Sequence, residues 1–440
     1  MSEFTTFEMR IKEFRKDNKI TSGDMSSRDL SRLMVRLVCL FSGVKDSRME
    51  GKVVYSINLL LSCIFLADLA GAENSEDVAE FWEHHHKTYR RVFGVEQIPS
   101  HDTFRRILSL VKNEDMNEAL SVALKKTFST LRHVLKIKSP EKRIISVDGK
   151  QERGTGRKES SSEEVKDLQT LNVYEQETDT CIYTDPIEVK TNEIPHGQDI
   201  LRIMNLKGAV VTFDAMHTQR ETISIIKDNG GDYVGGLKGN QSSLQEYCDR
   251  LFTTESVKKL EEKGGGFFYK TSEIAHNQLE ERFFYLHKAT RKELEGVFSG
   301  WKGLNSIVCF VKHTVNNVDG KENLETRTYI SSLSELKDIA YCIRGHWGVE
   351  NRLHWCLDTV FHEDGMHIAD RNAATNQSII NKAALTLCRL VEEFVGKKQK
   401  SIRRRRKVFG WDFEGELALM LSFLDEKTFN RIFTVTPKAN

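Results

Sequence analysis

Two aspartates stand where an α/β protein places catalytic groups. Asp148 ends the apolar stretch RIISVD, and Asp214 ends the stretch AVVTFD. Both stretches have the β-branched composition of a buried strand, and open α/β sheets bind ligands at the carboxyl ends of such strands. If the two strands are neighbours, the carboxylates converge and repel each other unless cations offset their charge. Carboxylate oxygens of this kind suit Mg²⁺ or Mn²⁺.

Glu350 is the best candidate for a third ligand. It lies in RGHWGVENRLHWCLD, residues 344–358, beside two tryptophans, two histidines and two arginines. On an α-helix, His346, Glu350 and His354 fall on one stripe at intervals of four residues. A third carboxylate would complete a site for two metal ions roughly 3.5–4 Å apart. The alternative is that the tryptophans belong to the core and the histidines pair with buried neighbours.

A zinc site is a second alternative for the same segment, because Cys342, His346, His354 and Cys356 are all possible zinc ligands. Their spacing matches none of the usual zinc motifs. The segment HEDGMH, residues 362–367, is similar to a zinc-protease signature, but its histidines are five residues apart instead of four. They would point to different faces of a helix. The sequence therefore favours the carboxylate site.

The elements that position these residues are indicated by hydrophobic periodicity. Helical spacing runs from about 26 to 136, strands alternate with helices from 143, and strand-like segments return at 265–330. We therefore expect the following parts: a helical N-terminal domain (1–140) that is a candidate for DNA binding, an α/β catalytic core (141–390) with a β-rich insertion at about 262–332, and a basic helical C-terminal tail (391–440).

Composition sets further bounds on this chain of 440 residues and net charge +1. The segment KKQKSIRRRRK (397–407) is either a phosphate-binding strip or a solvated helix face. Eight cysteines without a Cys-x-x-Cys pair, and a charged N-terminus, favour a cytosolic protein with reduced thiols. Asp68 interrupts the longest apolar run, 53–71, which favours a buried helix over a membrane span.

A series of short segments occurs in a characteristic order. The segments are AGAENSEDVAEFWEHHHKTYRRVFGV, VDGK, KTNEIP, VVTFDAMHTQ, GGDYVGGLKGNQ, YISSL and IRGHWGVENRLHWCLDTVFHEDGMHIADRNAATN. Through them the chain resembles the DDE transposases of bacterial insertion sequences, in particular the group of H-repeat-associated proteins. The resemblance spans roughly residues 45 to 390. Each segment alone is a weak signal, whereas the ordered series is highly specific.

The resemblance implies a ribonuclease-H-like fold in which Asp148, Asp214 and Glu350 bind two Mg²⁺ or Mn²⁺ ions, with a β-strand insertion between the second and third acids. It also implies cleavage of DNA at the ends of an insertion sequence and strand transfer into target DNA. The expected partners are double-stranded DNA (terminal inverted repeats and target) and further copies of the chain in a homodimer or larger assembly. No membrane is expected, and the expected location is the cytoplasm, at the nucleoid.

Basic and aromatic residues around the acids are the expected DNA contacts. They are Lys238, Arg344, His346, Trp347, Arg352, His354, Arg403, Arg404, Arg405 and Arg406. The wider superfamily carries Tyr, Arg and Lys at offsets −7, −4 and +7 from the glutamate, where this chain has Ile343, His346 and Leu357. These departures motivate a competing hypothesis, namely a degenerate relative that binds DNA but cuts it weakly or not at all.

Overall fold

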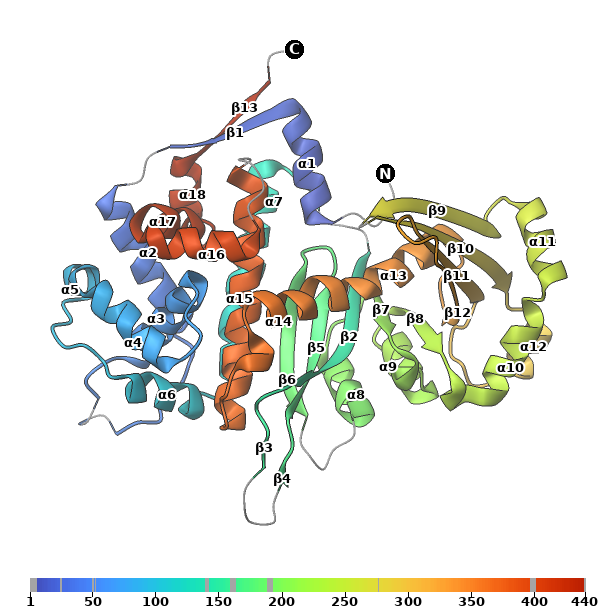
Figure 1. Ribbon diagram of the computed structural model, residues 1–440, viewed down its shortest axis with the longest axis horizontal. Coiled ribbons are helices and arrows are strands. Elements are labelled where there is room, and N and C mark those ends of the chain that lie inside the picture. Colours follow the sequence, from blue (N-terminus) through green and yellow to red (C-terminus); the bar gives the residue numbers. More distant parts are fainter. Residues whose placement is uncertain are drawn as a thin grey trace.

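A computed structural model (Figure 1) describes residues 6–23, 26–49, 51, 53–138, 142–158, 164–187, 193–275, 277–395 and 401–438. A helical region comes first. Its elements are α1 (Phe7–Asp17), β1 (Asn18–Ser22), α2 (Ser27–Leu40), α3 (Ile57–Ala70), α4 (Ser75–His84), α5 (His86–Phe93), α6 (His101–Leu110) and α7 (Asn113–Leu135). Residues next to the start of a helix cap its N-terminus. In α2, for example, Ser26 and Asp29 form a reciprocal capping box.

A mixed sheet follows the helical region. Its strands are β2 (Arg143–Glu152), β5 (Leu168–Glu175), β6 (Thr180–Ile187), β7 (Ala209–Phe213), β8 (Asp232–Leu237), β9 (Phe268–Ala275), β10 (Gln278–Lys288), β11 (Ser306–Asn316) and β12 (Glu322–Ser331). Across the described residues the strand order is β6-β5-β2-β7-β8-β12-β11-β10-β9. The β2–β7 and β7–β8 pairs are parallel, and the other neighbouring pairs are antiparallel. The short strands β3 (Arg157–Lys158) and β4 (Glu164–Val165) pair with each other.

The first strand is longer than its sequence indicates. The segment VDGK predicts that the strand runs into a glycine turn after Asp148, but β2 continues to Glu152. The reason is its antiparallel partner β5, which pairs with β2 along this whole stretch. Parallel pairing with β7 stops earlier, with Val147 opposite Phe213. Asp148 therefore lies where the parallel ladder ends, although its own strand runs on.

Helices cover both faces of the sheet (Figure 1). One face packs against α8 (Glu193–Ile203), α9 (Arg220–Asp228) and α10 (Ser242–Leu251), and the other packs against α13 (Leu336–Gly348). The strand residues alternate between these two cores. Ile144 belongs to the α13 side and Ile145 to the α8–α9 side, as the two-residue period of a strand requires.

The β-rich region extends the same sheet. The strands expected between about 262 and 332 are β9 to β12, which form antiparallel neighbours in sequence order. The segment NNVDGKEN (316–323) predicts a hairpin turn, and this prediction is confirmed because the segment joins β11 to β12. Strand β12 then pairs with β8. Two further helices flank this region at the right of Figure 1, α11 (Thr254–Lys263) and α12 (Arg291–Glu295).

The remaining elements return to the helical region. They are a π-helical turn (Val349–His354), α14 (Trp355–Val360), α15 (Arg371–Val395), α16 (Ile402–Trp411), α17 (Phe413–Ser422), α18 (Glu426–Ile432) and β13 (Phe433–Pro437). One hydrophobic cluster joins residues from both ends of the chain, including Leu37, Leu60, Val391 and Phe429. Strand β13 also pairs antiparallel with β1.

The helices of the described chain include none that is by itself long and apolar enough to cross a membrane. Helices α3 and α4 would reach the required length together, but they are bent by 96° at their junction. The predicted buried helix at 53–71 corresponds to α3, whose Leu60, Leu61 and Cys63 are fully buried.

Candidate active site

Asp148 and Asp214 occupy equivalent places on neighbouring strands. Val147 lies opposite Phe213 in the parallel ladder, so each aspartate is the next residue on its own strand. The chain after Asp214 turns at once into a single helical turn, Ala215–His217. The two carboxylates therefore emerge at the same edge of the parallel strands. The predicted strands are therefore neighbours, whereas a shared metal site for the two carboxylates stays a prediction.

Glu350 is delivered to this edge by the helix that crosses the sheet. Between α13 and α14 the backbone widens into the π-helical turn, in which the Trp355 N–H donates to the Glu350 carbonyl five residues earlier. Such turns often occur at functional sites. The straight stripe expected for His346, Glu350 and His354 is thereby split. His346 lies against Asp214, whereas Glu350 and His354 lie against Asp148.

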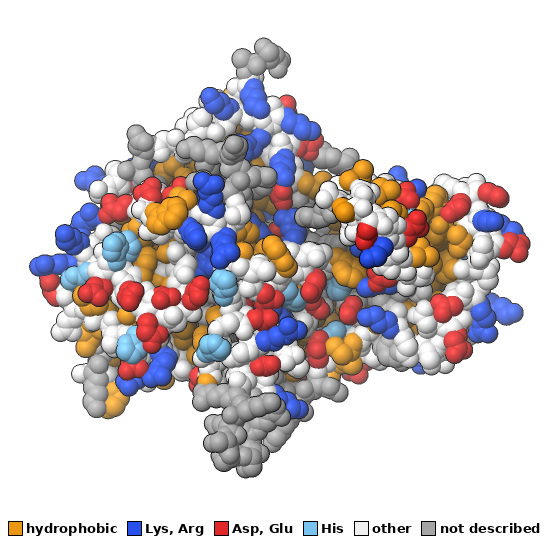
Figure 2. Space-filling model, viewed as in Figure 1, with side chains coloured by type: hydrophobic (Ala, Val, Ile, Leu, Met, Phe, Trp, Pro, Cys, Tyr) orange, Lys and Arg blue, Asp and Glu red, His pale blue; other side chains and the backbone are white. Residues whose placement is uncertain are grey.

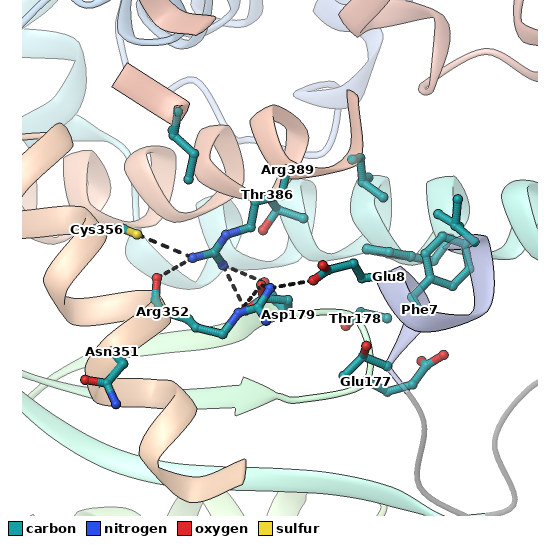
Figure 3. Close-up of a pocket in the computed structure, with 15 residues that line it drawn as sticks. Phe7, Glu8, Glu177, Thr178, Asp179, Asn351, Arg352, Cys356, Thr386 and Arg389 are labelled. Atoms are coloured by element: carbon teal, nitrogen blue, oxygen red, sulfur yellow. Dashed lines mark hydrogen bonds and ion pairs between the residues drawn. The ribbon is translucent and has the colours of Figure 1, made fainter. Parts of the chain in front are cut away.

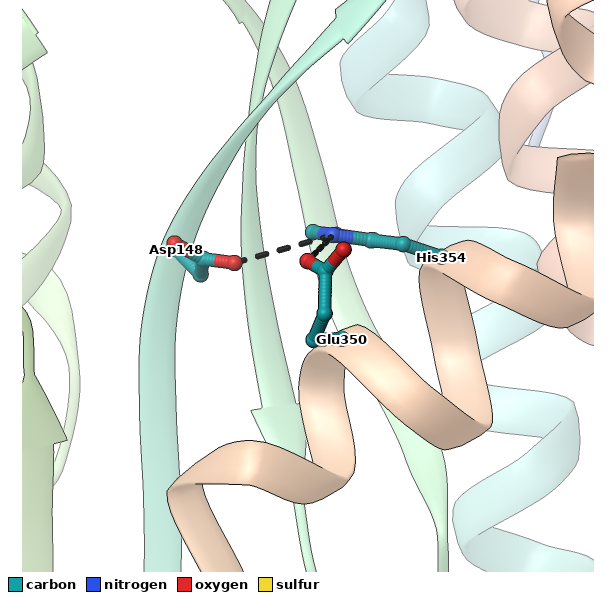
Figure 4. A group of neighbouring side chains, drawn as sticks. All are labelled: Asp148, Glu350 and His354. Carbon is teal, nitrogen blue, oxygen red and sulfur yellow. Dashed lines mark hydrogen bonds and ion pairs between the residues drawn. The ribbon is translucent and has the colours of Figure 1, made fainter. Parts of the chain in front are cut away.

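Asp148, Glu350 and His354 form a compact group (Figure 4). Their ligand atoms all lie within 4.8 Å of one another. His354 Nδ1 is 3.6 Å from Asp148 Oδ2 and 3.4 Å from Glu350 Oε2. The imidazole is buried, whereas the Glu350 side chain is 68% exposed. The group is therefore buried on the His354 side and open to solvent on the Glu350 side.

Asp214 stands beside this group and has its own histidine. His346 Nε2 lies 3.7 Å from Asp214 Oδ1. The other ring nitrogen, Nδ1, is 3.1 Å from the Thr212 hydroxyl. Thr212 in turn is 2.7 Å from the Ser146 hydroxyl, which accepts a hydrogen bond from Gln176 at 2.9 Å. A chain in which each hydroxyl donates onward leaves the His346 proton on Nε2, facing Asp214.

The acids influence one another electrostatically. Burial raises the pKa of Asp148, and the charges of Asp214 and Glu350 raise it further against the opposing effect of His354 and His346. The neighbouring His346 imidazole lowers the pKa of Asp214, and the hydrogen bond with His354 lowers that of Glu350. Asp148 is thus the acid of the three whose pKa is raised, because burial and the charges of two other carboxylates oppose its ionisation.

Acidic and histidine side chains gather over the middle of the face that Figure 2 shows, where α13 and α14 cross the sheet. Of the expected DNA contacts, Lys238, Arg403 and Arg404 are exposed. Arg344 is also exposed but forms an ion pair with Glu273. The Trp347 ring lies under the Arg327 guanidinium, 4.3 Å from its centre.

Three of the expected DNA contacts are already bound by protein groups in the structure, and their role in DNA binding stays a prediction. Arg406 is buried and donates to the Asp68 backbone carbonyl, and Arg405 is buried beside Glu416. Arg352 pairs with two carboxylates. The sequence left the basic run open as a phosphate-binding strip or a solvated helix face, and in the structure two of its arginines, Arg405 and Arg406, turn inward from α16. Residues 397–400 of that run and 190–192 of KTNEIP lie outside the described residues.

The sequence interpretation missed a buried ionic cluster next to the acids. Lys150, two residues beyond Asp148, contacts Asp358 at 2.6 Å and also binds the fully buried Glu363. Glu363 accepts a further hydrogen bond from Ser378 of α15 at 2.7 Å. The segments VDGK and HEDGMH, already singled out in the sequence, contain both partners. Their pairing was invisible because it joins distant parts of the chain.

The zinc alternative finds no support in the described residues. The metal-binding group there contains His354 but neither Cys342 nor Cys356. Both thiols are buried. Ile343 and Leu357, where the wider superfamily has polar residues, are buried as well. They belong to two of the hydrophobic cores and cannot reach a phosphate.

Comparison with known proteins identifies the family. Residues 139–387 match the model of the transposase DDE domain, and residues 38–122 match a domain associated with it. The chain therefore belongs to the DDE transposase family, and its enzyme class is that of the DDE-type transposases.

Individual relatives cover most of the chain. It is 30% identical to YncI of Escherichia coli O157:H7 over 84% of this chain and 90% of that protein. It is 29% identical to the H repeat-associated YhhI of Escherichia coli K12, over 82% and 90% respectively. A piggyBac transposase synaptic complex with hairpin DNA aligns over 97% of this chain and 82% of that chain, at 11% identity and a TM-score of 0.32. That score is too low to define a shared fold.

Proposed function

We propose that this transposase cuts DNA at the ends of an insertion sequence and joins the cut ends to target DNA, with Asp148, Asp214 and Glu350 as its metal ligands. The observation that carries the proposal is the meeting of Asp148 with Glu350 in one compact group. The order β6-β5-β2-β7-β8, crossed by α13, supports the assignment of these elements to a ribonuclease-H-like core.

The residues present fit divalent ions. Two carboxylates and an imidazole face one point, and a third carboxylate lies close enough to raise the pKa of Asp148. Oxygen-rich donor sets of this kind suit Mg²⁺ or Mn²⁺. Two such ions would activate the attacking water and stabilise the leaving 3′ oxygen. Asp148, Asp214 and Glu350 would hold these ions.

The protein groups have separate tasks in this scheme. His354 would hold the Asp148 and Glu350 carboxylates in place, and His346 would do the same for Asp214. In the first step, water would form a bond to phosphorus as the bond to the 3′ oxygen breaks, and the leaving 3′ oxygen would take up a proton as water loses one. In the second step, the freed 3′-hydroxyl would lose its proton and attack a target phosphate, and the 3′ oxygen of the target strand would leave. The exposed Glu350 side leaves room for DNA to approach.

We infer that double-stranded DNA binds across this face. Lys238, Arg344, Arg403 and Arg404 would contact phosphates, which position the duplex without reading its sequence. Trp355, 60% exposed five residues after Glu350, would stack on an unpaired base. Assembly as a homodimer or larger complex on paired DNA ends, at the nucleoid, belongs to the same proposal.

The test is cleavage of DNA that carries the terminal repeats of the element. We expect Asp148→Asn, Asp214→Asn and Glu350→Gln each to reduce Mg²⁺-dependent nicking to background, because each removes a charged ligand. Binding of the same DNA, measured by electrophoretic mobility shift, should persist. The matched control is Glu335→Gln, an exposed acid at the start of α13, which should leave nicking unchanged.

The possible results separate the competing hypotheses. Full nicking by Asp148→Asn or Glu350→Gln would reject the metal-site assignment. DNA binding without nicking by the wild-type chain, in Mg²⁺ and in Mn²⁺, would instead favour the degenerate DNA-binding relative. A strand-joining assay with a supplied 3′-hydroxyl end separates transposition from simple nuclease activity.

A further inference from the structure

An ionic network lies behind the π-helical turn that carries Glu350 (Figure 3). Its centre is Asp179, in the tight turn between β5 and β6. Arg352 binds Asp179 through Nε at 2.8 Å and also pairs with Glu8 of α1 at 2.9 Å. Arg389 of α15 pairs with Asp179 at 2.9 Å. Three elements that are distant in sequence thus meet at one carboxylate.

Asp179 is held in an unusual backbone conformation. Its φ is +55°, in the left-handed region of backbone conformation that residues other than glycine, asparagine and aspartate rarely adopt. The Tyr174 hydroxyl also donates to its carboxylate. The Asp179 side chain is only 13% exposed, so its charge is offset mainly by the two arginines. This turn is therefore built to present one carboxylate to the back of the catalytic helix.

Arg389 also binds the π-helical turn directly. Its Nη2 donates to the Arg352 backbone carbonyl, and the same nitrogen lies 3.6 Å from the Cys356 sulfur. A π-helical turn is rare because it strains the usual hydrogen-bond pattern of a helix. External donors to its carbonyls lower the cost of that conformation. Arg389 thus supports the widened turn from outside the helix.

The widened turn decides which way Glu350 points. Successive residues of an α-helix are related by a rotation of about 100° about the helix axis. If the turn lost its extra residue, α14 would rotate relative to α13. Side chains before and after the turn would then no longer face the same edge of the sheet. In the structure, where this turn is present, His354 contacts both Asp148 and Glu350.

We propose that Asp179 and Arg389 are positioning residues for Glu350. They stabilise the π-helical turn from the side opposite the acids, and so fix Glu350 and His354 against Asp148. The inference rests on the proposed function, because it takes the acids as a metal site. Neither residue touches the acids, so their effect must pass through the turn.

The test measures Mn²⁺ affinity by isothermal titration calorimetry and by electron paramagnetic resonance, without DNA. We expect Asp179→Asn and Arg389→Met each to weaken Mn²⁺ binding about 10-fold, the lower end of the range for groups that orient metal ligands. Asparagine tolerates the left-handed conformation, so Asp179→Asn keeps the turn while removing its charge. Arg389→Lys should recover part of the affinity.

A double variant distinguishes positioning from general loss of stability. In a Glu350→Gln background, Arg389→Met should weaken Mn²⁺ binding by less than in the wild-type background, because Glu350, one of the two side chains that it positions, is already lost. Equal weakening in both backgrounds, or wild-type affinity in Asp179→Asn and Arg389→Met, would overturn the inference. Arg371→Met, on the same helix α15 but bonded only to the Lys166 carbonyl among the described contacts, is the control and should bind normally.

The proposed function fails in a recognisably different way. In that case the wild-type chain would bind no Mn²⁺, or Glu350→Gln and Asp148→Asn would bind it as tightly as wild type. The inference would fall with it. If those two variants do lose affinity, the metal site stands, and the positioning variants alone decide the inference.

Discussion

Glu152 is a buried acid whose protonation we expect to affect the stability of the folded chain. It is fully buried four residues beyond Asp148 on β2, and accepts a hydrogen bond from Thr170 at 3.2 Å. Burial, reinforced by the charge of Glu363, raises its pKa to about 7. The folded chain therefore keeps a proton that the unfolded chain releases above its ordinary pKa of 4.5. The contribution of Glu152 to stability is fully present below that value and is lost as the pH rises through about 7.

Replacement of Glu152 by glutamine removes this titration, because the amide is neutral at every pH. We expect the unfolding free energy of Glu152→Gln to rise relative to wild type by about 1–3 kcal/mol between pH 5 and pH 8. Urea denaturation at pH 5, 6, 7 and 8 measures the difference. Glu262→Gln, at an exposed position, should show none. Parallel pH profiles for wild type and Glu152→Gln would contradict the prediction.

Two glycines of α13 provide a matched pair at the scale of a structural element. A Cβ atom at Gly345 would lie 1.7 Å from Oε1 of Gln176, whose amide is buried and donates to Ser146. A Cβ atom at Gly348 would meet only Tyr174, at an ordinary 3.9 Å. Helix α13 therefore approaches the sheet closely at one glycine and not at the other.

We expect Gly345→Ala to lower the unfolding free energy by about 1–3 kcal/mol, because the Gln176 amide must move and give up its bond to Ser146. It should also lower DNA nicking, since Ser146 leads through Thr212 to His346. Gly348→Ala should instead stabilise the chain by about 0.5–1 kcal/mol, as alanine favours a helix over glycine. Chemical denaturation and nicking assays on both variants measure these effects. Similar stability of the two variants would refute the close approach.

The helices at the two ends of the chain form one body at the scale of the whole molecule. Leu37 and Leu60 share a hydrophobic cluster with Val391 and Phe429, and β1 pairs with β13. The polar contacts agree, since the Arg406 guanidinium binds Asp68 of α3. A boundary near residue 140 therefore separates kinds of secondary structure but not independent cores.

We accordingly expect a fragment of residues 1–140 not to fold alone, because it would expose the apolar surface that α15 to α18 cover. Circular dichroism should show no cooperative thermal transition for the fragment. Coexpression with residues 141–440 should restore a complex that melts cooperatively. A sharp transition of the isolated fragment would establish the N-terminal helices as a domain of their own.

The local elements and the candidate acids could be predicted from the amino-acid sequence alone. Apolar periodicity indicated the helices before 136, and the β-branched runs before Asp148 and Asp214 indicated strands, because such patterns depend on neighbouring residues. The ordered segments pointed to the family that the comparisons then established. The ligand roles of Asp148, Asp214 and Glu350 stay a prediction until variants are assayed.

The contacts between side chains that are distant in the sequence could be identified only from the tertiary structure. It turned Arg405 and Arg406 inward, paired Arg352 with Asp179, and brought Lys150 to Glu363. It also placed a π-helical turn where periodicity indicated a straight helix, so that His346 and His354 serve different acids. These outcomes depend on contacts between residues far apart in the chain, and the spacing of residues along a sequence contains no record of such contacts.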